Sequence, residues 1–537
     1  MKRIDTQAIV IGGGATGAGV LRDLSLRGIK AVLLEKKDIA NGTTGRNHGL
    51  LHSGARYAVS DIESARECIS ENIILKKIAR NCVESTGGLF VTLPGDDESY
   101  HEKLMKGCRE AGIHCENINV KKVFKMAPNI NPGIVSALHV PDGTIDPFRL
   151  AVANILDAEE HGAKAYTYTG ITGIIRDKDI VKGVTCVDEK TGEEFGIYAD
   201  LIVNASGIWA QNLCSMAGID LKMTASKGSV LVIDYRINNI VLNCCRAPSN
   251  GDIIVPNDTV SLVGTTSKNI DYNRIDNPMP DNDEIEELYM RAKEMIPDVA
   301  KARVLRVYSG VRPLVAQGKA NDGRKISRGI ALLDHEERDG VGGIITITGG
   351  KLMTYRLMAE MAADLACKKL KINKKCVTHK KHLPGSKMRK LEARSVKHYT
   401  GIANSVVGST FNRHGERIAR ILKRDKKNYR IICECEIVTE GEIAYVIKNF
   451  NVRDLEDLKR RTRIGMGPCQ GELCAYRSAG LFVQYGAAEP EDADKLLADF
   501  IEERWKGIRP VFWGDAMREA EFIYWVYEGL FGIGEVK

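Results

Sequence analysis

The chain has 537 residues, of which 44% are hydrophobic and 27% are charged, a composition typical of globular proteins. One hydrophobic core does not support this length, so we expect roughly two to four domains. The net charge of +7 is small for this size and does not indicate nucleic-acid binding. No apolar run of about 18 residues could span a membrane, and Met1 leads almost directly into a strand, leaving no room for a signal peptide. We therefore expect a cytoplasmic protein.

The first 35 residues predict a dinucleotide-binding βαβ unit. Residues 4–11 end in an apolar run typical of a strand, and residues 31–34 form a second such run. Residues 18–27 between them have the apolar spacing of a helix, which Gly28 ends. A glycine-rich turn joins the first strand to this helix.

The glycine-rich turn has the G-x-G-x-x-G pattern that binds a pyrophosphate. Gly12 permits the tight turn, Gly14 lets the backbone approach the phosphates, and Gly17 lets the helix pack closely. The helix N-terminus adds unpaired N–H groups and the positive end of its dipole. Glu35, at the end of the second strand, can accept hydrogen bonds from a ribose diol. The predicted cofactor contacts of the turn are Gly12, Gly13, Gly14, Ala15, Thr16 and Gly17.

The loop at residues 38–57 is rich in small and hydrogen-bonding residues. It directly follows the strand that ends at Glu35, so we expect it to lie along the cofactor; the alternative is an ordinary solvated loop. Its candidate cofactor contacts are Thr43, Thr44, Arg46, Asn47, His48, Gly49 and Leu50.

Beyond this loop, the sequence predicts a substrate-binding lobe and a return to the dinucleotide sheet. Helices are expected at residues 62–82, 148–161 and 283–295, and strands at residues 171–175, 180–187 and 194–198. Residues 89–140 mix both patterns and are expected to begin the lobe, and residues 225–266 alternate as in an antiparallel sheet. Residues 199–209 are typical of a buried strand that rejoins the dinucleotide sheet, which makes Ala205 and Gly207 candidate cofactor contacts.

A basic segment and a second glycine-rich strand end follow. Residues 303–328 carry cations interleaved with apolar residues, so some are expected to point inward, although a solvated charged face is the alternative. These cations are Arg303, Arg306, Arg312, Lys319, Arg324, Lys325 and Arg328. The strand at 343–348 ends in Gly349 and Gly350, and a helix is expected from Leu352 to Lys369. Its N-terminus is a second predicted anion site, with Gly349, Gly350 and Leu352 as candidate cofactor contacts.

Four of the fourteen cysteines form a predicted metal site. Cys433 and Cys435 form a C-x-C pair, and Cys469 and Cys474 form a C-x4-C pair after 33 intervening residues. Four thiolates from two short loops suit an iron–sulfur cluster or zinc. Structural zinc usually has C-x2–4-C pairs, so the spacing favours iron–sulfur, with zinc or unligated thiols as alternatives. The ten other cysteines are expected to be small buried residues.

The C-terminal part begins with a basic segment and ends in an aromatic tail. Residues 371–400 are broken by Pro384 and Gly385, as is typical of a linker, and residues 410–425 have helical spacing. The tail from residue 488 carries Trp505, Phe512, Trp513, Phe522, Trp525, Tyr527 and Phe531. Such residues favour interfaces with proteins or membrane surfaces, and packing against the chain's own domains is an equally open alternative.

Several motifs together resemble the FAD-dependent glycerol-3-phosphate dehydrogenases. They are the turn at residues 12–17, Arg46-Asn47-His48-Gly49-Leu50-Leu51-His52-Ser53-Gly54-Ala55-Arg56-Tyr57, Ser309-Gly310-Val311-Arg312-Pro313-Leu314 and Thr348-Gly349-Gly350-Lys351-Leu352-Met353-Thr354-Tyr355-Arg356. The cysteine region resembles the [2Fe-2S]-binding domain of the bacterioferritin-associated ferredoxin type. Joined in this order, the motifs resemble the anaerobic branch of the family, whose enzymes have several subunits, over nearly the whole chain.

The resemblance implies non-covalent FAD, a [2Fe-2S] cluster and oxidation of sn-glycerol 3-phosphate to dihydroxyacetone phosphate. Electrons would pass to partner subunits and then to a quinone, which would place the chain peripherally on the inner face of the cell membrane. The family positions near the substrate are Arg56, Arg312, Arg328 and Lys351, and His52 is the first candidate for the proton acceptor. The aerobic, single-subunit branch has a histidine after a Lys-Gly-Ser motif, whereas Val230 stands at that place here.

The implied fold is an α/β FAD-binding Rossmann-like domain with an antiparallel-sheet substrate lobe, a small helical iron–sulfur domain and a helical tail. The FAD-dependent region covers residues 1–370. We expect its dinucleotide domain at about residues 1–75, 140–225 and 300–370, its lobe at about 76–140 and 225–300, a linker and helix at 371–428, the [2Fe-2S]-binding domain at 429–487 and the tail at 488–537.

Two other functions remain open on the sequence. An FAD and iron–sulfur amine or amino-acid dehydrogenase would need one arginine for a carboxylate and an apolar pocket for the amine. The basic segment at 303–328 and the motif at 309–314 favour a phosphate substrate instead. A flavin and iron–sulfur electron carrier without a substrate of its own is the non-enzymatic alternative.

Overall fold

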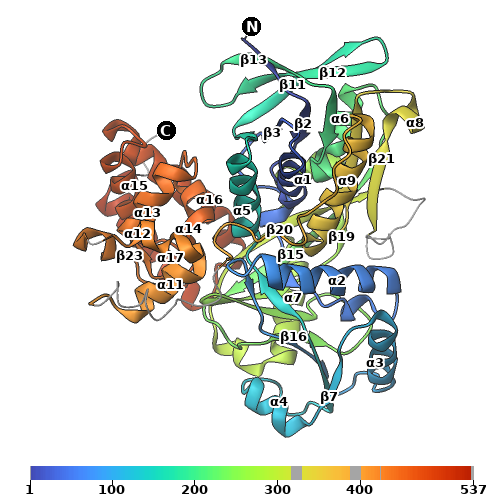
Figure 1. The fold of residues 1–537 in the computed structure, drawn as a ribbon. Coiled ribbons are helices and arrows are strands. Elements are labelled where there is room, and N and C mark those ends of the chain that lie inside the picture. The colour runs from blue at the N-terminus through green and yellow to red at the C-terminus, as the bar shows by residue number, and fades with distance from the viewer. Residues whose placement is uncertain (1, 316–328, 388–400, 424, 534–537) are drawn as a thin grey trace.

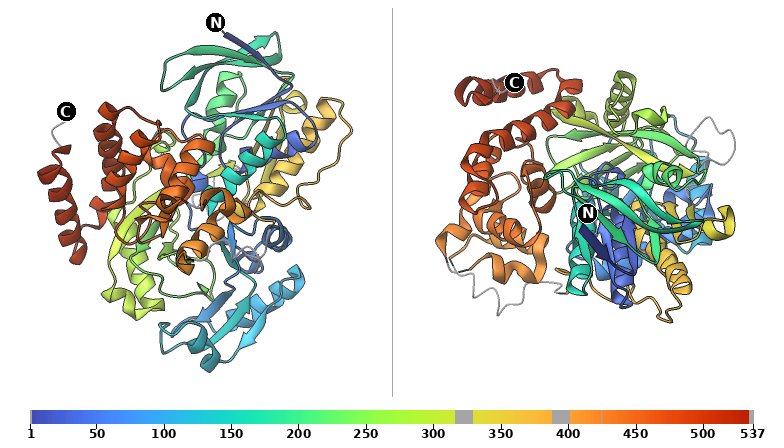
Figure 2. Two further views of the ribbon diagram at one scale, coloured as in Figure 1. Left: turned by 60° about the vertical axis from the view of Figure 1, so that its left-hand side comes forward. Right: turned by 90° about the horizontal axis from the view of Figure 1, so that it is seen from above.

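The computed structural model describes residues 2–315, 329–387, 401–423 and 425–533 (Figure 1). The predicted site residue Arg328, the cations Lys319, Arg324 and Lys325, and residues 388–400 of the expected linker lie outside this range. In Figure 1 two sheet regions are stacked along the long axis of the molecule, and the C-terminal helices lie along one side. The view from above in Figure 2 also shows the C-terminal helices along one side.

A six-stranded sheet forms the dinucleotide domain. Its order is β10 (Lys164–Tyr166), β3 (Ala31–Leu34), β2 (Ala8–Ile11), β14 (Leu201–Asn204), β22 (Ile344–Gly349) and β21 (Ile330–Asp334). The first five strands are parallel, and β21 is antiparallel to β22. Every residue of β2, β3 and β14 is buried, as expected of a parallel sheet covered on both faces. The predicted return of the chain at residues 199–209 is therefore confirmed.

Three helices cover one face of this sheet. They are α1 (Ala15–Leu26), α5 (Pro147–Glu160) and α9 (Tyr355–Lys369), and they share one apolar core with the strands. On the other face lie α6 (Ala210–Met216) and a four-stranded sheet, β1 (Lys2–Asp5), β13 (Glu194–Tyr198), β12 (Ile180–Asp188) and β11 (Thr169–Asp177). The single strand expected at residues 4–11 is wrong. Thr6 N–H bonds to Tyr198 O (3.0 Å) whereas Gln7 N–H bonds to Lys30 O (3.1 Å), so the chain changes sheets between them.

A nine-stranded sheet forms the lobe. Its order is β19 (Lys268–Asn269), β15 (Met223–Ile233), β18 (Val260–Gly264), β17 (Ile253–Asn257), β16 (Val241–Cys244), β6 (Gly88–Thr92), β8 (Ser136–Val140) and β7 (Glu116–Ile118), with β20 (Val304–Val315) paired to β15. The strands within residues 225–266 pair antiparallel, as predicted. The expected boundary at residue 300 differs from the sheet order, because β20 continues the lobe's sheet.

Smaller elements surround the lobe and connect it to the dinucleotide domain. They are α3 (Ser99–Ala111), α4 (Val120–Met126), α7 (Asn282–Met295), α2 (Ile62–Ile78) and a three-stranded sheet of β4 (Leu50–Leu51), β9 (Gly143–Ile145) and β5 (Val83–Glu84). The short α8 (His335–Asp339) lies instead on the dinucleotide sheet, against β21 and β22. Of the ten scattered cysteines, eight are buried as predicted, while Cys115 and Cys376 are only half-buried.

The C-terminal region is mainly helical. Its elements are α11 (Asn404–His414), α12 (Ile418–Ile421), β23 (Ile431–Cys433), β24 (Val438–Thr439), α13 (Glu440–Asn449), α14 (Leu455–Thr462), α15 (Cys474–Gln484), α16 (Ala493–Ile508) and α17 (Asp515–Tyr524). The one helix expected at 410–425 is wrong, because α11 ends before Gly415. This glycine has φ +56°, and a Cβ there would lie 1.8 Å from Gly385 O.

Buried charges dock the C-terminal helices onto the dinucleotide domain. Asp38, which follows β3 and is 1% exposed, accepts from Arg460 Nη1 (2.9 Å) and Arg461 Nη2 (2.6 Å) on α14. The Tyr168 hydroxyl donates to Asp454 and Asp457 of the same region, at 2.8 Å each. The loop that follows Glu35 is therefore held directly against the C-terminal region.

Candidate active site and metal centre

The turn at residues 12–17 has the close contacts that only glycine permits. Gly12 has φ +110°, and a Cβ there would lie 2.6 Å from Ala205 O. A Cβ on Gly17 would lie 1.9 Å from Gly12 O, so the helix packs onto the turn itself. A Cβ on Gly14, by contrast, would approach only Thr44, with its Oγ1 at 3.0 Å. Gly12 and Gly17 are thus required by backbone contacts of the fold, whereas a side chain on Gly14 would meet only the Thr44 side chain.

The N-terminus of α1 is suited to binding an anion. Its N-cap residue, Gly14, has no side chain to cap it, and its first turn holds no acidic residue. Ala15 N–H donates to Thr44 Oγ1 (3.0 Å), which ties the loop after β3 to the helix end. The Glu35 carboxylate accepts from Gly13 N–H (2.7 Å) and Lys37 N–H (2.8 Å), and burial raises its pKa. The helix end, the open side of Gly14 and the acid at the strand end fit the pyrophosphate and ribose of FAD.

The loop at residues 38–57 crosses from the turn to the lobe. Thr43 Oγ1 donates to Val311 O on β20 (2.6 Å), and Asn47 Nδ2 donates to Thr44 O (2.6 Å). Asn47 Oδ1 accepts from Gly49 N–H (2.7 Å), just before the buried β4. These hydrogen bonds connect the loop to β20, so its predicted cofactor contacts lie on one segment between the two sheets.

The second glycine pair precedes α9, as predicted. Gly349 and Gly350 have φ +79° and +65°, and a Cβ on Gly349 would lie 2.4 Å from Gly329 O. Lys351 follows them, and Leu352 opens the short 3-10 turn that leads into α9. Lys351 Nζ donates to Ser64 Oγ on α2 (3.0 Å) and lies 4.7 Å from the centroid of the Tyr57 ring. Lys351 is thus held at the entrance of the helix, on the side of α2.

His52 and Lys351 both lie next to Tyr57, and His48 lies next to His52. The His52 ring is 5.5 Å from the Tyr57 ring and 5.9 Å from the His48 ring, measured between centroids. The structure therefore brings these three predicted residues together through Tyr57. Tyr57 belongs to the recognised motif but was not predicted as a site residue.

Arg312 lies on β20 beside the turn that follows β18. Its Nη1 donates to Ser226 Oγ (3.2 Å) and Lys227 O (3.1 Å), and its Nη2 donates to Thr265 Oγ1 (3.0 Å) and Thr266 O (2.7 Å). The same turn approaches His48, because a Cβ on Gly264 would lie 3.6 Å from His48 Cδ2. Arg312 therefore lies near His48, and its guanidinium is fixed by hydrogen bonds to backbone carbonyls and hydroxyls.

Arg56 and Lys227 have structural partners. Arg56 Nη2 donates to Asp252 Oδ2 (3.0 Å), and its buried Nη1 has no partner among the described residues. Lys227 is 2% exposed and forms ion pairs with Asp281 (3.0 Å) and Glu284 (2.7 Å). These pairings could not be read from the sequence, because the acids lie far away in the chain.

The four predicted cysteines converge at one end of the C-terminal region. Cys433 ends β23, Cys474 begins α15, and Cys435 and Cys469 lie in the loops between. The Cys433 thiol contacts Cys474, and the Cys469 thiol contacts both Cys435 and Cys474. Hydrogen bonds from the Cys435 and Cys474 thiols and from a backbone N–H lower the pKa of Cys469, which favours its thiolate.

The backbone around the cysteines is built for close approach. A Cβ on Gly467 would lie 2.5 Å from Cys435 Cβ, and Gly471 has φ +99°. Backbone N–H groups of Glu436 and Gly465 point at Cys433 Sγ. Four convergent thiols with N–H donors fit the ligation of an iron–sulfur cluster.

A cavity of about 470 Å³ lies between the cysteine loops and the loop after β3. Arg46, Asn47 and Gly49 line one wall, and Met466 and Gln470, the latter next to Cys469, line the other. The predicted flavin loop and the cysteine centre are thus neighbours across one cavity, as electron transfer between them requires.

Two family models match the chain. The FAD dependent oxidoreductase model matches residues 7–356, and the BFD-like [2Fe-2S] binding domain model matches residues 431–482. Both predicted cofactors are therefore confirmed, and the zinc alternative for the four cysteines is not supported.

Comparisons over the full length identify the family. The chain is 51% identical over 536 residues to the A subunit of anaerobic glycerol-3-phosphate dehydrogenase from Escherichia coli (strain K12), covering 99% of this chain and 98% of that protein. It is 39% identical to the A1 subunit of the same enzyme from Haloferax volcanii, covering 95% and 88%. The solved structure of glycerol-3-phosphate dehydrogenase from Bacillus halodurans complexed with FAD has the same fold, with a TM-score of 0.71 at 22% identity over 95% of this chain and 96% of that one. The chain belongs to the family of anaerobic glycerol-3-phosphate dehydrogenase A subunits.

Proposed function

We propose that the chain oxidises sn-glycerol 3-phosphate to dihydroxyacetone phosphate and passes the electrons to partner subunits. The observation that carries this proposal is the grouping of Lys351, His52 and His48 around Tyr57, in a chain that also has a dinucleotide turn and four convergent cysteines. When bound, FAD accepts the hydride from C2 of the substrate, and the [2Fe-2S] cluster carries single electrons onward. The chain's own residues bind the phosphate, orient C2 and accept the hydroxyl proton.

The substrate phosphate needs several cations, because it is close to a dianion at neutral pH. Lys351 at the entrance of α9 and Arg312 beside the Gly264 turn are the first candidates. The buried, unpartnered Nη1 of Arg56 is a further donor that a phosphate oxygen would satisfy. Arg328 remains a family-based candidate outside the described residues.

His52 is the proposed proton acceptor. Leu50 N–H donates to His48 Nδ1 (3.2 Å), so a neutral His48 carries its proton on Nε2 and serves as a donor. His52 lies beside His48 and Tyr57 and is the second imidazole of the proposed site. A histidine acceptor here takes the place of the histidine that the single-subunit branch carries where Val230 stands.

Partner subunits and a quinone are proposed as the route for the electrons. The relatives are named as A or A1 subunits, which supports an enzyme built from several chains. No helix among the described residues is both long and apolar enough to cross a bilayer. From the family resemblance, we also propose that the chain lies at the inner face of the cell membrane through its partners.

An anaerobic titration of the purified chain tests the proposal. The flavin absorbance is expected to bleach with glycerol 3-phosphate and to stay unchanged with proline or glycine. Bleaching by the amino acids instead would establish the amine-dehydrogenase alternative, and no bleaching by any of these substrates would favour an electron carrier.

Substitutions extend this test to the phosphate. Lys351→Ala is expected to weaken glycerol 3-phosphate binding by about 1.5–3 kcal/mol, the range for a charged hydrogen bond, while FAD stays bound. Lys368→Ala, on the exposed C-terminal end of the same helix, is the matched control and should bind substrate normally. Equal affinity in both variants would remove Lys351 from the phosphate site.

A further inference from the structure

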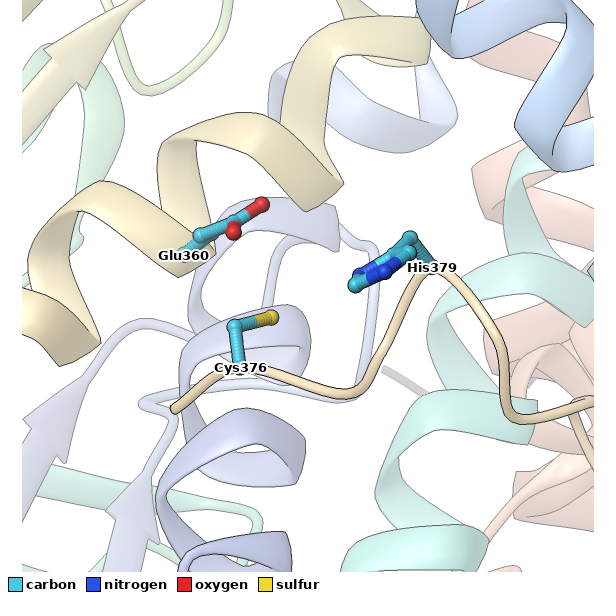
Figure 3. Close-up of side chains that lie close together, drawn as sticks. All are labelled: Glu360, Cys376 and His379. Carbon is cyan, nitrogen blue, oxygen red and sulfur yellow. The ribbon is translucent and has the colours of Figure 1, made fainter. Parts of the chain in front are cut away.

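Three metal-binding side chains meet beside α9, away from the cysteine cluster. Glu360 lies on α9, and Cys376 and His379 lie on the segment that follows this helix. Figure 3 shows the three side chains pointing into the same space, Glu360 from the helix and the other two from the facing loop. One donor atom of each lies within 4.8 Å of the other two.

The donor set matches the preferences of zinc. A thiolate sulfur, an imidazole nitrogen and a carboxylate oxygen are all common zinc ligands, at about 2.0–2.3 Å from the metal. In a tetrahedral site these bond lengths put the donors roughly 3.3–3.8 Å apart. Small side-chain movements would therefore bring the three donor atoms to the distances found around a bound ion. All three residues are half-buried, so a water molecule has room to be the fourth ligand.

Arg356 links Glu360 to a second carboxylate, on α2. Arg356 donates to Glu71 through Nε (2.8 Å) and Nη2 (2.5 Å), and also to Glu360 through Nη1 (2.6 Å). One guanidinium is therefore shared by two carboxylates, and the charge of Glu360 is only partly offset. Arg356 Nη1 also bonds to Thr378 Oγ1 (3.2 Å), which lies 3.0 Å from Cys376 Sγ. Glu360 and Cys376 thus belong to one polar network that spans α2, α9 and the loop.

We propose that Glu360, Cys376 and His379 bind one zinc ion. Its two positive charges balance the Glu360 carboxylate and the Cys376 thiolate, and the imidazole binds neutral. The ion ties the segment after α9, which leads toward the [2Fe-2S]-binding domain, to the dinucleotide domain. Glu360, Cys376 and His379 are not among the residues predicted to bind the flavin or the phosphate, so we propose this site as separate from the proposed oxidation.

Metal analysis of the full chain, purified anaerobically with FAD and its cluster, tests this site. After growth with added zinc and dialysis, we expect about one zinc per chain besides the cluster iron. Cys376→Ser is expected to lose this zinc while flavin absorbance and iron content stay unchanged. Cys115→Ser, at the other half-buried scattered cysteine, is the matched control and should keep the zinc.

X-ray absorption at the zinc edge identifies the site independently. We expect one sulfur ligand, with nitrogen and oxygen ligands completing the shell. A four-sulfur shell would mean that zinc occupies the cysteine cluster, and it would overturn the proposal. Absence of retained or titratable zinc would overturn it as well. If Cys376→Ser does not fold, His379→Gln replaces it, and unchanged zinc content in that variant would equally refute the site.

Discussion

At the scale of single residues, the glycines of the dinucleotide turn separate folding from cofactor binding. A side chain on Gly17 would collide with Gly12 O and disrupt the turn itself, whereas a side chain on Gly14 would meet only the Thr44 side chain. Gly14→Val is therefore expected to place its side chain in the path of the pyrophosphate and to abolish flavin binding in folded protein. The measurement is flavin absorbance after purification, with iron content as the indicator of folding.

The matched control for this variant is Gly408→Val. Gly408 lies on α11, and no atom lies within 4 Å of the place that a Cβ on this residue would take, so a small side chain has room there. This protein should keep its full flavin content. Full flavin retention in Gly14→Val would contradict the assignment of the turn.

Local sequence patterns indicate candidate site residues, whereas the partners of these residues lie far away in the chain. Gly12, Gly14, Gly17 and Glu35 follow from a short local pattern, and the structure places them around the end of α1. The pairing of Arg56 with Asp252 could not be foreseen, because 196 positions separate them in the chain. Ser64 carries no motif at all, and it is recognised only as the partner of Lys351.

At the scale of elements, α11 belongs with the iron–sulfur domain. Arg413 at its end is buried, and it donates to both carboxylate oxygens of Glu442 on α13, at 2.6 and 2.7 Å. It also donates to Glu436 O (2.8 Å) and Ile437 O (2.8 Å), close to Cys435. The helix expected to be part of a linker therefore braces the loop that carries the first cysteine pair.

This brace gives a prediction for Arg413→Ala. Removing one partner of a buried ion pair leaves the other charge uncompensated, which costs about 3–5 kcal/mol of stability. The variant is expected to lose its iron at a lower temperature while the flavin domain unfolds normally. Arg420→Ala, on the exposed face of α12, is the control. The melting of both variants is monitored by cluster and flavin absorbance. Identical melting of the two variants would show that the Arg413 contacts are not needed to stabilise the iron–sulfur domain.

Element boundaries show where local patterns are insufficient. The helix expected at 148–161 is close to α5, because Asp146 caps it by accepting from Phe148 and Arg149 N–H. The helix expected at 62–82 ends earlier, at Ile78, because Ile78 O accepts from Leu383 N–H (2.8 Å). A capping residue nearby in the sequence is predictable, whereas a partner about three hundred residues away is not.

At the scale of the whole molecule, the aromatic tail divides into packed and exposed residues. Tyr527 is 2% exposed, and its hydroxyl donates to Gly471 O (3.2 Å) and Glu472 O in the cysteine loop. Phe522 and Trp525, by contrast, are 57% and 60% exposed. The two sequence-based alternatives for the tail thus apply to different residues, and the exposed ones are candidates for a partner contact.

Substitution of the exposed pair tests this contact. Phe522→Ser with Trp525→Ser is expected to leave dye-linked oxidation of glycerol 3-phosphate unchanged and to weaken coupling to a quinone-reducing partner fraction. Tyr527→Phe, which keeps the packed ring, is the control for the tail's own structure. Full coupling in the double variant would assign the exposed aromatics no role in partner binding.

The docking of the two cofactor regions makes the last prediction possible. Asp38 joins α14 to the loop after β3, although 422 positions separate it from Arg460, and the cysteine loops face the predicted flavin loop across one cavity. If this arrangement serves electron transfer, the cluster is dispensable for the first half-reaction and required for the second.

Cys469→Ser removes one thiolate ligand and is expected to abolish the cluster. Flavin bleaching by glycerol 3-phosphate should then continue at nearly the normal rate, while electron delivery to a partner or quinone falls sharply. Wild-type protein should contain about two cluster irons per chain and give a rhombic EPR signal on reduction. If delivery persists in Cys469→Ser without iron, the electrons leave by another route.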